Sequence, residues 1–177
     1  MNPDIVTIYT DASYSRSHSL AVLASVVYQN ESEHEEIPLS DKKINLLQIK
    51  ESNNIRAEVN AAIFALRTCT SHSKIQLYSD CRTLIELPRR RKKLEALNFI
   101  SQSKKTPLAN ADLYKEFYKL FDTFQLELIW LKGHTSKKKQ TKLQKNFSHL
   151  DNEARKKLRE CVANIKQVEK GASFSTE

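Results

Sequence analysis

The sequence lacks segments that would direct the protein to a membrane or anchor it there. Its 177 residues contain no hydrophobic run close to the about 20 residues of a membrane-spanning helix. Residues 1–4 have neither the basic nor the apolar region of a signal peptide. The three cysteines, Cys69, Cys81 and Cys161, are odd in number and far apart, which argues against a disulfide framework or a zinc motif. We therefore expect reduced thiols, a cytoplasmic location and no membrane partner.

Glycine is also scarce, and the sequence shows no sign of an internal division. Two glycines in the whole chain are unusually few for a globular protein, although 40% hydrophobic residues is an ordinary proportion. We find no internal repeat and no linker that would divide the chain, and its length suits one domain with a real core. We predict one domain over residues 1–169 and a flexible C-terminal tail over residues 170–177.

Positive charge is present in excess and is clustered. The chain has 29 basic and 21 acidic residues, a net charge of +8. Residues 89–93 are all basic, and residues 132–145 contain six lysines and no acid. Either cluster alone could be solvated surface. Two such clusters on one small domain favour a polyanionic partner, most simply a nucleic acid.

The first hydrophobic run, residues 5–10, predicts a central β-strand that ends on Asp11. Its residues are β-branched except for one tyrosine, and it is apolar on both faces. Residues 75–78 repeat the arrangement, because this apolar strand runs through Ser79 to Asp80. An acid just past a strand is often only a turn residue. A helix between the two strands, however, implies a right-handed crossover and parallel pairing, which would place Asp11 and Asp80 at the same rim of the sheet.

Other strands are predicted around these two. Residues 20–28 and 35–40 should form strands of an antiparallel meander, and residues 125–131 should form a fifth strand. Residues 41–52 are ambiguous, and we interpret them as a loop that could include the end of a strand.

Helices are predicted from apolar residues at helical spacing. One should start at Asn54 as its N-cap, a short one over 83–87 should stop at Pro88, and others should cover 94–100 and 113–124. A last helix should carry Leu150 and Ala154 on its packed face, with Asp151 near its N-terminus. In that position Asp151 could simply complement the helix dipole.

Glu58 is the acid on the first of these helices. It lies three residues after Ile55 and four before Ala62, which places its carboxylate at the edge of the buried stripe. A glutamate on the inner edge of a helix needs a partner or a metal ion.

These segments, taken together, resemble type 1 ribonuclease H over nearly the whole chain. The matching stretches, in order, are Tyr9-Thr10-Asp11-Ala12-Ser13, Asn53-Asn54-Ile55-Arg56-Ala57-Glu58 with Ala61-Ala62, Ser79-Asp80, Asn110-Ala111-Asp112-Leu113, Trp130-Leu131-Lys132-Gly133-His134 and Asp151-Asn152-Glu153-Ala154-Arg155. Any one motif is weak, but the ordered set is specific. The segment between His134 and Asp151 is longer and richer in lysine than in typical members.

The resemblance implies an α/β fold of the RNase H type, with a five-stranded mixed sheet flanked by helices. It makes Asp11, Glu58, Asp80 and Asp151 metal-binding and catalytic carboxylates, and His134 a mobile catalytic histidine. Asn54 would contact the substrate backbone, and a basic handle would grip it through Arg89, Arg90, Arg91, Lys92 and Lys93. We further predict that Lys137, Lys138 and Lys139 bind nucleic acid.

The expected activity is hydrolysis of the RNA strand of RNA/DNA hybrids, leaving 5′-phosphate and 3′-hydroxyl ends. Two Mg²⁺ ions roughly 4 Å apart, with Mn²⁺ as a possible substitute, would stabilise charge on the attacking and leaving oxygens. The partner would be the hybrid, and we expect a monomer without an obligatory protein partner. Two alternatives stay open: a nuclease of this fold acting on another nucleic acid, and a basic binding module without catalysis.

Overall fold

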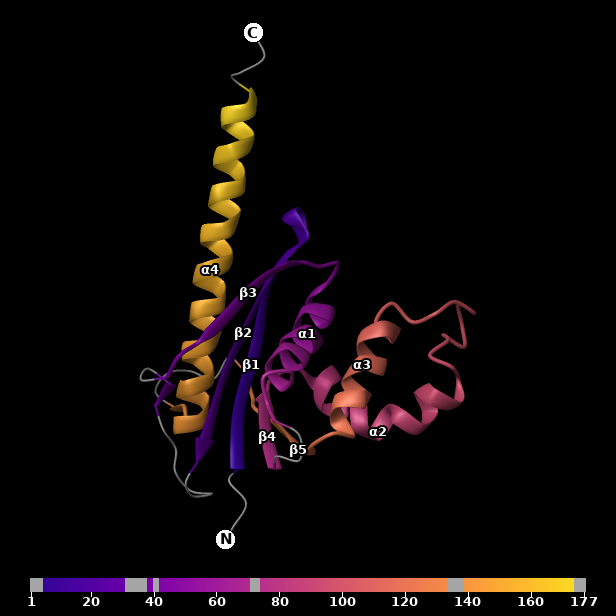
Figure 1. The fold of residues 1–177 in the computed structure, drawn as a ribbon. Coiled ribbons are helices and arrows are strands. Elements are labelled where there is room, and N and C mark those ends of the chain that lie inside the picture. The colour runs from indigo at the N-terminus through magenta and orange to yellow at the C-terminus, as the bar shows by residue number, and fades with distance from the viewer. Residues whose placement is uncertain (1–4, 31–37, 40–41, 71–73, 134–138, 174–177) are drawn as a thin grey trace.

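The computed structural model describes residues 5–30, 38–39, 42–70, 74–133 and 139–173, and these form one five-stranded sheet flanked by helices (Figure 1). The strands are β1 (Ile5–Ser15), β2 (Leu20–Asn30), β3 (Asn45–Lys50), β4 (Lys74–Ser79) and β5 (Gln125–Trp130). They lie in the order β3-β2-β1-β4-β5. β1 pairs antiparallel with β2 and parallel with β4, and β4 pairs parallel with β5. The predicted mixed sheet is therefore confirmed.

Helices cover both faces of the sheet (Figure 1). α1 (Asn54–Leu66), α2 (Arg82–Ala96) and α3 (Ala111–Phe121) lie on one side, and α4 (Lys142–Ser173) lies on the other. Successive residues of β1 serve the two faces in turn, as strand geometry requires. Ile8 packs into the core beneath α1 and α3, whereas Tyr9 packs with Leu150 of α4.

Asp11 lies inside β1 and not at its end, so that prediction is wrong in detail. β2 pairs with β1 as far as Ser15, and this keeps the backbone extended past Asp11. The pairing of β4 with β1, in contrast, stops at Tyr9 opposite Tyr78. The β4 side of β1 is therefore open next to Asp11, and this is where Asp80 follows the end of β4.

The third strand is not where the sequence predicted it. β3 is Asn45–Lys50, within the stretch interpreted as a loop, and it pairs antiparallel with β2. Of the predicted strand 35–40, only residues 38 and 39 are described, and neither is in a strand. β3 is an edge strand whose Leu46 and Leu47 are both exposed, so its sequence does not alternate between buried apolar and exposed polar residues.

α2 continues through Pro88, where the sequence predicted a stop. Proline inside a helix removes one backbone hydrogen bond, at a cost of about 3 kcal/mol. Leu84, Leu87 and Leu94 nevertheless form one buried face along α2. The carbonyl of Leu87 also accepts a hydrogen bond from the hydroxyl of Tyr118, at 2.8 Å. Burial of these leucines outweighs the defect, and residues 89–93 are helical as a result.

α4 is longer than predicted at both ends. It begins at Lys142, so Asp151 lies well inside it and cannot act as a first-turn acid. It ends at Ser173, beyond the boundary predicted at residue 169. Within the described part of the chain, none of the helices is long and apolar enough to cross a membrane.

Candidate metal centre and active site

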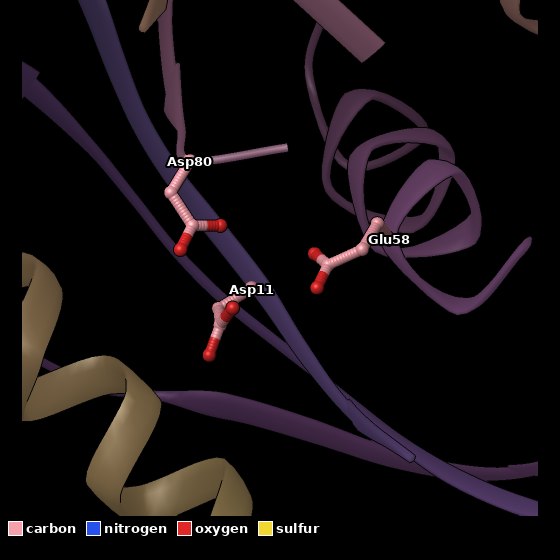
Figure 2. Close-up of side chains that lie close together, drawn as sticks. All are labelled: Asp11, Glu58 and Asp80. Atoms are coloured by element: carbon pink, nitrogen blue, oxygen red, sulfur yellow. The ribbon is translucent and has the colours of Figure 1, made fainter. Parts of the chain in front are cut away.

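Three acidic side chains from separate elements meet beside the open edge of β1. Asp11 comes from β1, Glu58 from α1, and Asp80 from the residue after β4. One carboxylate oxygen of each lies within 4.8 Å of the others, and Figure 2 shows the three groups directed toward a common space. The sequence predicted the shared rim for Asp11 and Asp80 and the inward edge for Glu58.

Burial sets the electrostatics of this cluster. Asp11 is 4% exposed and Glu58 is 6% exposed. Burial raises the pKa of the Asp11 carboxyl well above its ordinary value, and the charges of Asp151 and Asp80 add to the shift. Burial likewise raises the pKa of Glu58, and the charges of Asp11 and Asp80 act in the same direction. Without a cation, burial and mutual repulsion therefore oppose ionisation of all these carboxyls at once.

The chemistry of these oxygens suits a hard divalent cation. Oδ2 of Asp11 and Oε2 of Glu58 are buried and have no hydrogen-bond partner among the described residues. A buried carboxylate oxygen without a partner is costly, and a bound cation removes that cost. Carboxylate oxygens are also the ligands that Mg²⁺ prefers. The residues present thus fit a divalent metal ion.

The backbone around Asp80 is held by its neighbours. The amide of Cys81 donates to the hydroxyl of Ser79 at 3.1 Å, which closes the turn that carries Asp80. The indole of Trp130 donates to the carbonyl of Asp80 at 3.3 Å. Gly133 lies directly against the side chain, because a Cβ added there would be 2.5 Å from Oδ2 of Asp80. The position of the Asp80 carboxylate is therefore set both by the end of β4 and by the segment that follows β5.

Asp151 stands at the wall of the site and outside the group of three. Its Oδ1 forms an ion pair with Nε of Arg155, one turn further along α4, at 2.6 Å. Its charge still contributes to the raised pKa of Asp11, so the two carboxylates are neighbours. Arg155 is not among the predicted site residues, although its spacing of four residues from Asp151 is typical of an ion pair on a helix.

The four acids and Arg155 line one cavity of about 380 Å³. Asn54 also lines it, but its side chain is hydrogen-bonded to Glu58 and lowers the pKa of that carboxyl. Asn54 is not the N-cap of α1. That residue is Asn53, whose Oδ1 accepts from the amide of Arg56 at 3.0 Å.

The residues of the predicted basic handle lie on α2 in different environments. Arg89 has an 80% exposed side chain, with a long contact of 3.8 Å to Glu86. Arg91 contacts α3 and the residue that caps its C-terminus. Its Nη2 donates to Oδ2 of Asp122 at 2.8 Å, and its guanidinium lies over the ring of Tyr118.

The other three residues of the handle differ in exposure. Arg90 lies over the ring of Tyr114, and Lys92 and Lys93 are exposed. Arg91 thus joins α2 to α3, whereas its exposed neighbours are available to an anion.

The predicted residues after β5 are described only in part. His134, Lys137 and Lys138 lie outside the described residues, so their assignment remains a prediction. Lys139 is exposed, just before α4 begins. The lysine-rich segment that the sequence suggested as a long loop is therefore helical from Lys142 onward.

The mixed sheet and the acids gathered at its edge define an α/β domain with an acidic cluster that fits a divalent cation. The family model for RNase H matches residues 3–159. Ribonuclease H from Caldanaerobacter subterraneus subsp. tengcongensis is 32% identical over 137 residues, covering 76% of this chain and 82% of that protein. Ribonuclease HI from Synechocystis is 27% identical over 138 residues, covering 77% of this chain and 81% of that protein.

A solved structure shows the same fold. LC9-RNase H1, described as a type 1 RNase H with the type 2 active-site motif, superposes with a TM-score of 0.62 at 15% identity, covering 87% of this chain and 72% of that one. The chain belongs to the RNase H family.

Proposed function

We propose that this protein is a divalent-metal-dependent endonuclease that hydrolyses the RNA strand of RNA/DNA hybrids and leaves 5′-phosphate and 3′-hydroxyl ends. We further propose that it acts as a cytoplasmic monomer. One observation supports the chemistry above all others. Asp11 and Glu58 each have a buried carboxylate oxygen without a partner among the described residues, and they form a group with Asp80 in which one oxygen of each residue lies within 4.8 Å of the others. Family membership supports the choice of substrate.

Asp11, Glu58 and Asp80 would hold the metal, with Asp151 adjoining them from α4. The cofactor we propose is Mg²⁺, as two ions, with Mn²⁺ as a substitute. When bound, divalent cations supply positive charge that stabilises the attacking and leaving oxygens of a phosphodiester.

The protein's own contribution is orientation and proton transfer. In the reaction, a water molecule loses a proton as its oxygen bonds to phosphorus, the bond from phosphorus to the 3′-oxygen breaks, and the 3′-oxygen takes up a proton. His134 is the residue we assign to proton handling, because imidazole titrates close to neutral pH. Exposed cations on α2, including Arg89 and Lys92, would hold substrate phosphates outside the cavity.

The experiment that tests this function is a cleavage assay on four labelled substrates: RNA/DNA, RNA/RNA, DNA/DNA and single strands. We expect cleavage of the RNA strand of the hybrid in Mg²⁺, and no cleavage in EDTA. Cleavage of another substrate in preference would replace hybrid specificity with that of a different nuclease. Binding without cleavage in Mg²⁺ or Mn²⁺ would make the protein a nucleic-acid-binding module.

The matched variant is Asp80→Asn, which keeps the size of the side chain and removes its charge. We expect it to abolish cleavage while the protein stays folded and binds hybrid, since the fold of β4 does not depend on that charge. Wild-type rates from Asp80→Asn would refute the assignment of Asp80.

A further inference from the structure

The C-terminal half of α4 extends beyond the domain shared with the family. The family match ends at residue 159, whereas the helix continues to Ser173. Figure 1 shows this part of α4, drawn in yellow, projecting past the end of the sheet. An α-helix rises about 1.5 Å per residue, so the last turns of α4 reach well outside the core.

One side of this helix half carries a row of cations. Arg155, Arg159 and Lys166 are spaced i, i+4 and i+11, which places them along one side of an α-helix. All three are exposed. Between Arg155 and Lys166 the sequence contains one acid, Glu160.

The acid does not neutralise this row. Glu160 is paired with Lys157 at 3.6 Å. Arg155 is the member of the row that is bound, to Asp151 at the wall of the active site. Arg159 and Lys166 form no ion pair with the described residues. Their charge is therefore available to an external anion.

The row is continuous with the active site. Arg155 lines the cavity that contains the acids, and Arg159 and Lys166 line a second cavity of about 380 Å³. Tyr14, at the end of β1, lines both cavities and so joins them. The hydroxyl of Tyr14 donates to the carbonyl of Ser52 at 2.8 Å, which holds the ring in this position.

The helix is anchored beneath the row. Leu158 and Cys161 are buried against Leu20 and Val22 of β2, on the side of α4 that faces the sheet. The cations are thus carried on the exposed side of a helix whose other side is packed on the sheet. Arg155 and Lys166 are about 16 Å apart along the helix, which corresponds to about five steps of a duplex at ~3.4 Å each.

We propose that Arg155, Arg159 and Lys166 form a phosphate-binding tract that guides the substrate's backbone from the active-site cavity along α4. The tract rests on the proposed function, because it takes the same nucleic acid as the acidic site. Its chemistry fits this occupant: guanidinium and ammonium groups at intervals along a straight helix match the charges of a sugar-phosphate chain. The tract positions substrate and takes no part in the bond-breaking step.

The test compares two double variants that each remove two positive charges. Arg159→Ala with Lys166→Ala changes the tract, and Lys119→Ala with Lys156→Ala changes exposed lysines that line neither cavity. Binding is measured on a hybrid of about 18 base pairs, which is long enough to occupy the cavity and to reach Lys166. An Asp80→Asn background prevents cleavage during this measurement.

We expect the tract variant to weaken binding of the hybrid about ten- to fifty-fold at 0.1 M salt, and to make the slope of log affinity against log salt shallower by about 1 to 2. The control variant should lose clearly less affinity for the same hybrid. In the cleaving protein, KM should rise and kcat should stay the same, because phosphate contacts act on ground and transition states alike.

Equal losses in the two double variants would overturn the tract, as would an unchanged salt slope in the tract variant. Sedimentation without nucleic acid gives a further test. If the unaltered protein is a dimer and the tract variant is a monomer, this face is a subunit interface and the tract is overturned. Failure of the proposed function is distinguishable, since it would appear as absent hybrid cleavage by the unaltered protein, whereas the tract is judged by binding.

Discussion

Gly133→Ala tests whether the segment after β5 positions the carboxylate of Asp80. The added Cβ would lie 2.5 Å from Oδ2 of Asp80, but 3.4 Å from Cγ and 3.5 Å from Cβ, so the clash is with the carboxylate end alone. Oδ2 must move about 1 Å to reach an ordinary van der Waals separation. Gly133 does not have a positive φ, so alanine fits its backbone. The variant therefore displaces a proposed metal ligand without straining the main chain.

The expected effects on stability and on turnover differ widely. Rotating one side chain off its preferred rotamer costs about 1 kcal/mol, and replacing glycine by alanine recovers about 0.4–1 kcal/mol through the unfolded chain. The melting temperature should therefore change by no more than about 4 °C. A misplacement of about 1 Å at a reacting centre can reduce the rate about 100-fold. We expect kcat to fall by about that factor and the Mg²⁺ concentration needed for half-maximal activity to rise.

The assay is steady-state cleavage of an RNA/DNA hybrid over a series of Mg²⁺ concentrations, with thermal unfolding measured in parallel. Lys132→Ala is the control, since it changes the neighbouring exposed side chain and should keep kcat even if KM rises. A Gly133→Ala protein with the unaltered kcat and Mg²⁺ dependence would refute the reasoning. A large loss of stability would do so as well, because the contact would then support the fold.

Three further predictions concern stability and proton transfer. Arg56→Met should lower the free energy of unfolding by about 2 kcal/mol in a denaturant titration. The reason is that Nε of Arg56 lies 2.8 Å from a carboxylate oxygen of Glu51, whose side chain is only 7% exposed. Asp112→Asn should lower it less in the same titration, since the side chain of Asp112 is 62% exposed. In EDTA near neutral pH, Asp11→Asn should raise the melting temperature. The pKa of Asp11 is raised in the folded protein, so its contribution to stability is present at low pH and is lost as the pH rises through the pKa of the folded state. Asparagine does not ionise, so the variant avoids that loss. A lower melting temperature for Asp11→Asn would contradict this sign. His134→Ala should lower kcat and leave KM nearly unchanged, and equal turnover across the pH range would withdraw its role.

The positions of the central acids follow from local sequence patterns. Two apolar strands separated by a helix require a right-handed crossover, and this brings Asp11 and Asp80 to one rim whatever the details of the loops. The spacing of Glu58 from Ile55 and Ala62 likewise settles the side of α1 from which its carboxylate emerges. These signals are short-range and periodic, so the sequence alone contains them.

Three features depended on contacts between distant segments. α2 passes through Pro88 because Leu84, Leu87 and Leu94 find a buried surface, and that surface exists only once α1 and α3 are packed on the sheet. β3 is a strand because β2 offers it an edge to pair with. Arg91 belongs to a run of basic residues that looks uniform in sequence, yet Asp122 occupies its side chain.

What the sequence by itself determined is which residue types stand at the ends and edges of its strands and helices, and hence the family and the acids of the site. The tertiary structure alone decided how deeply each acid is buried and which oxygens keep a partner. Asp151 shows the difference, since its place inside α4 and its pairing with Arg155 depend on where that helix begins. Burial and pairing are sums over groups far apart in the chain, and their effect on a carboxylate's pKa exists only when the fold has brought those groups together.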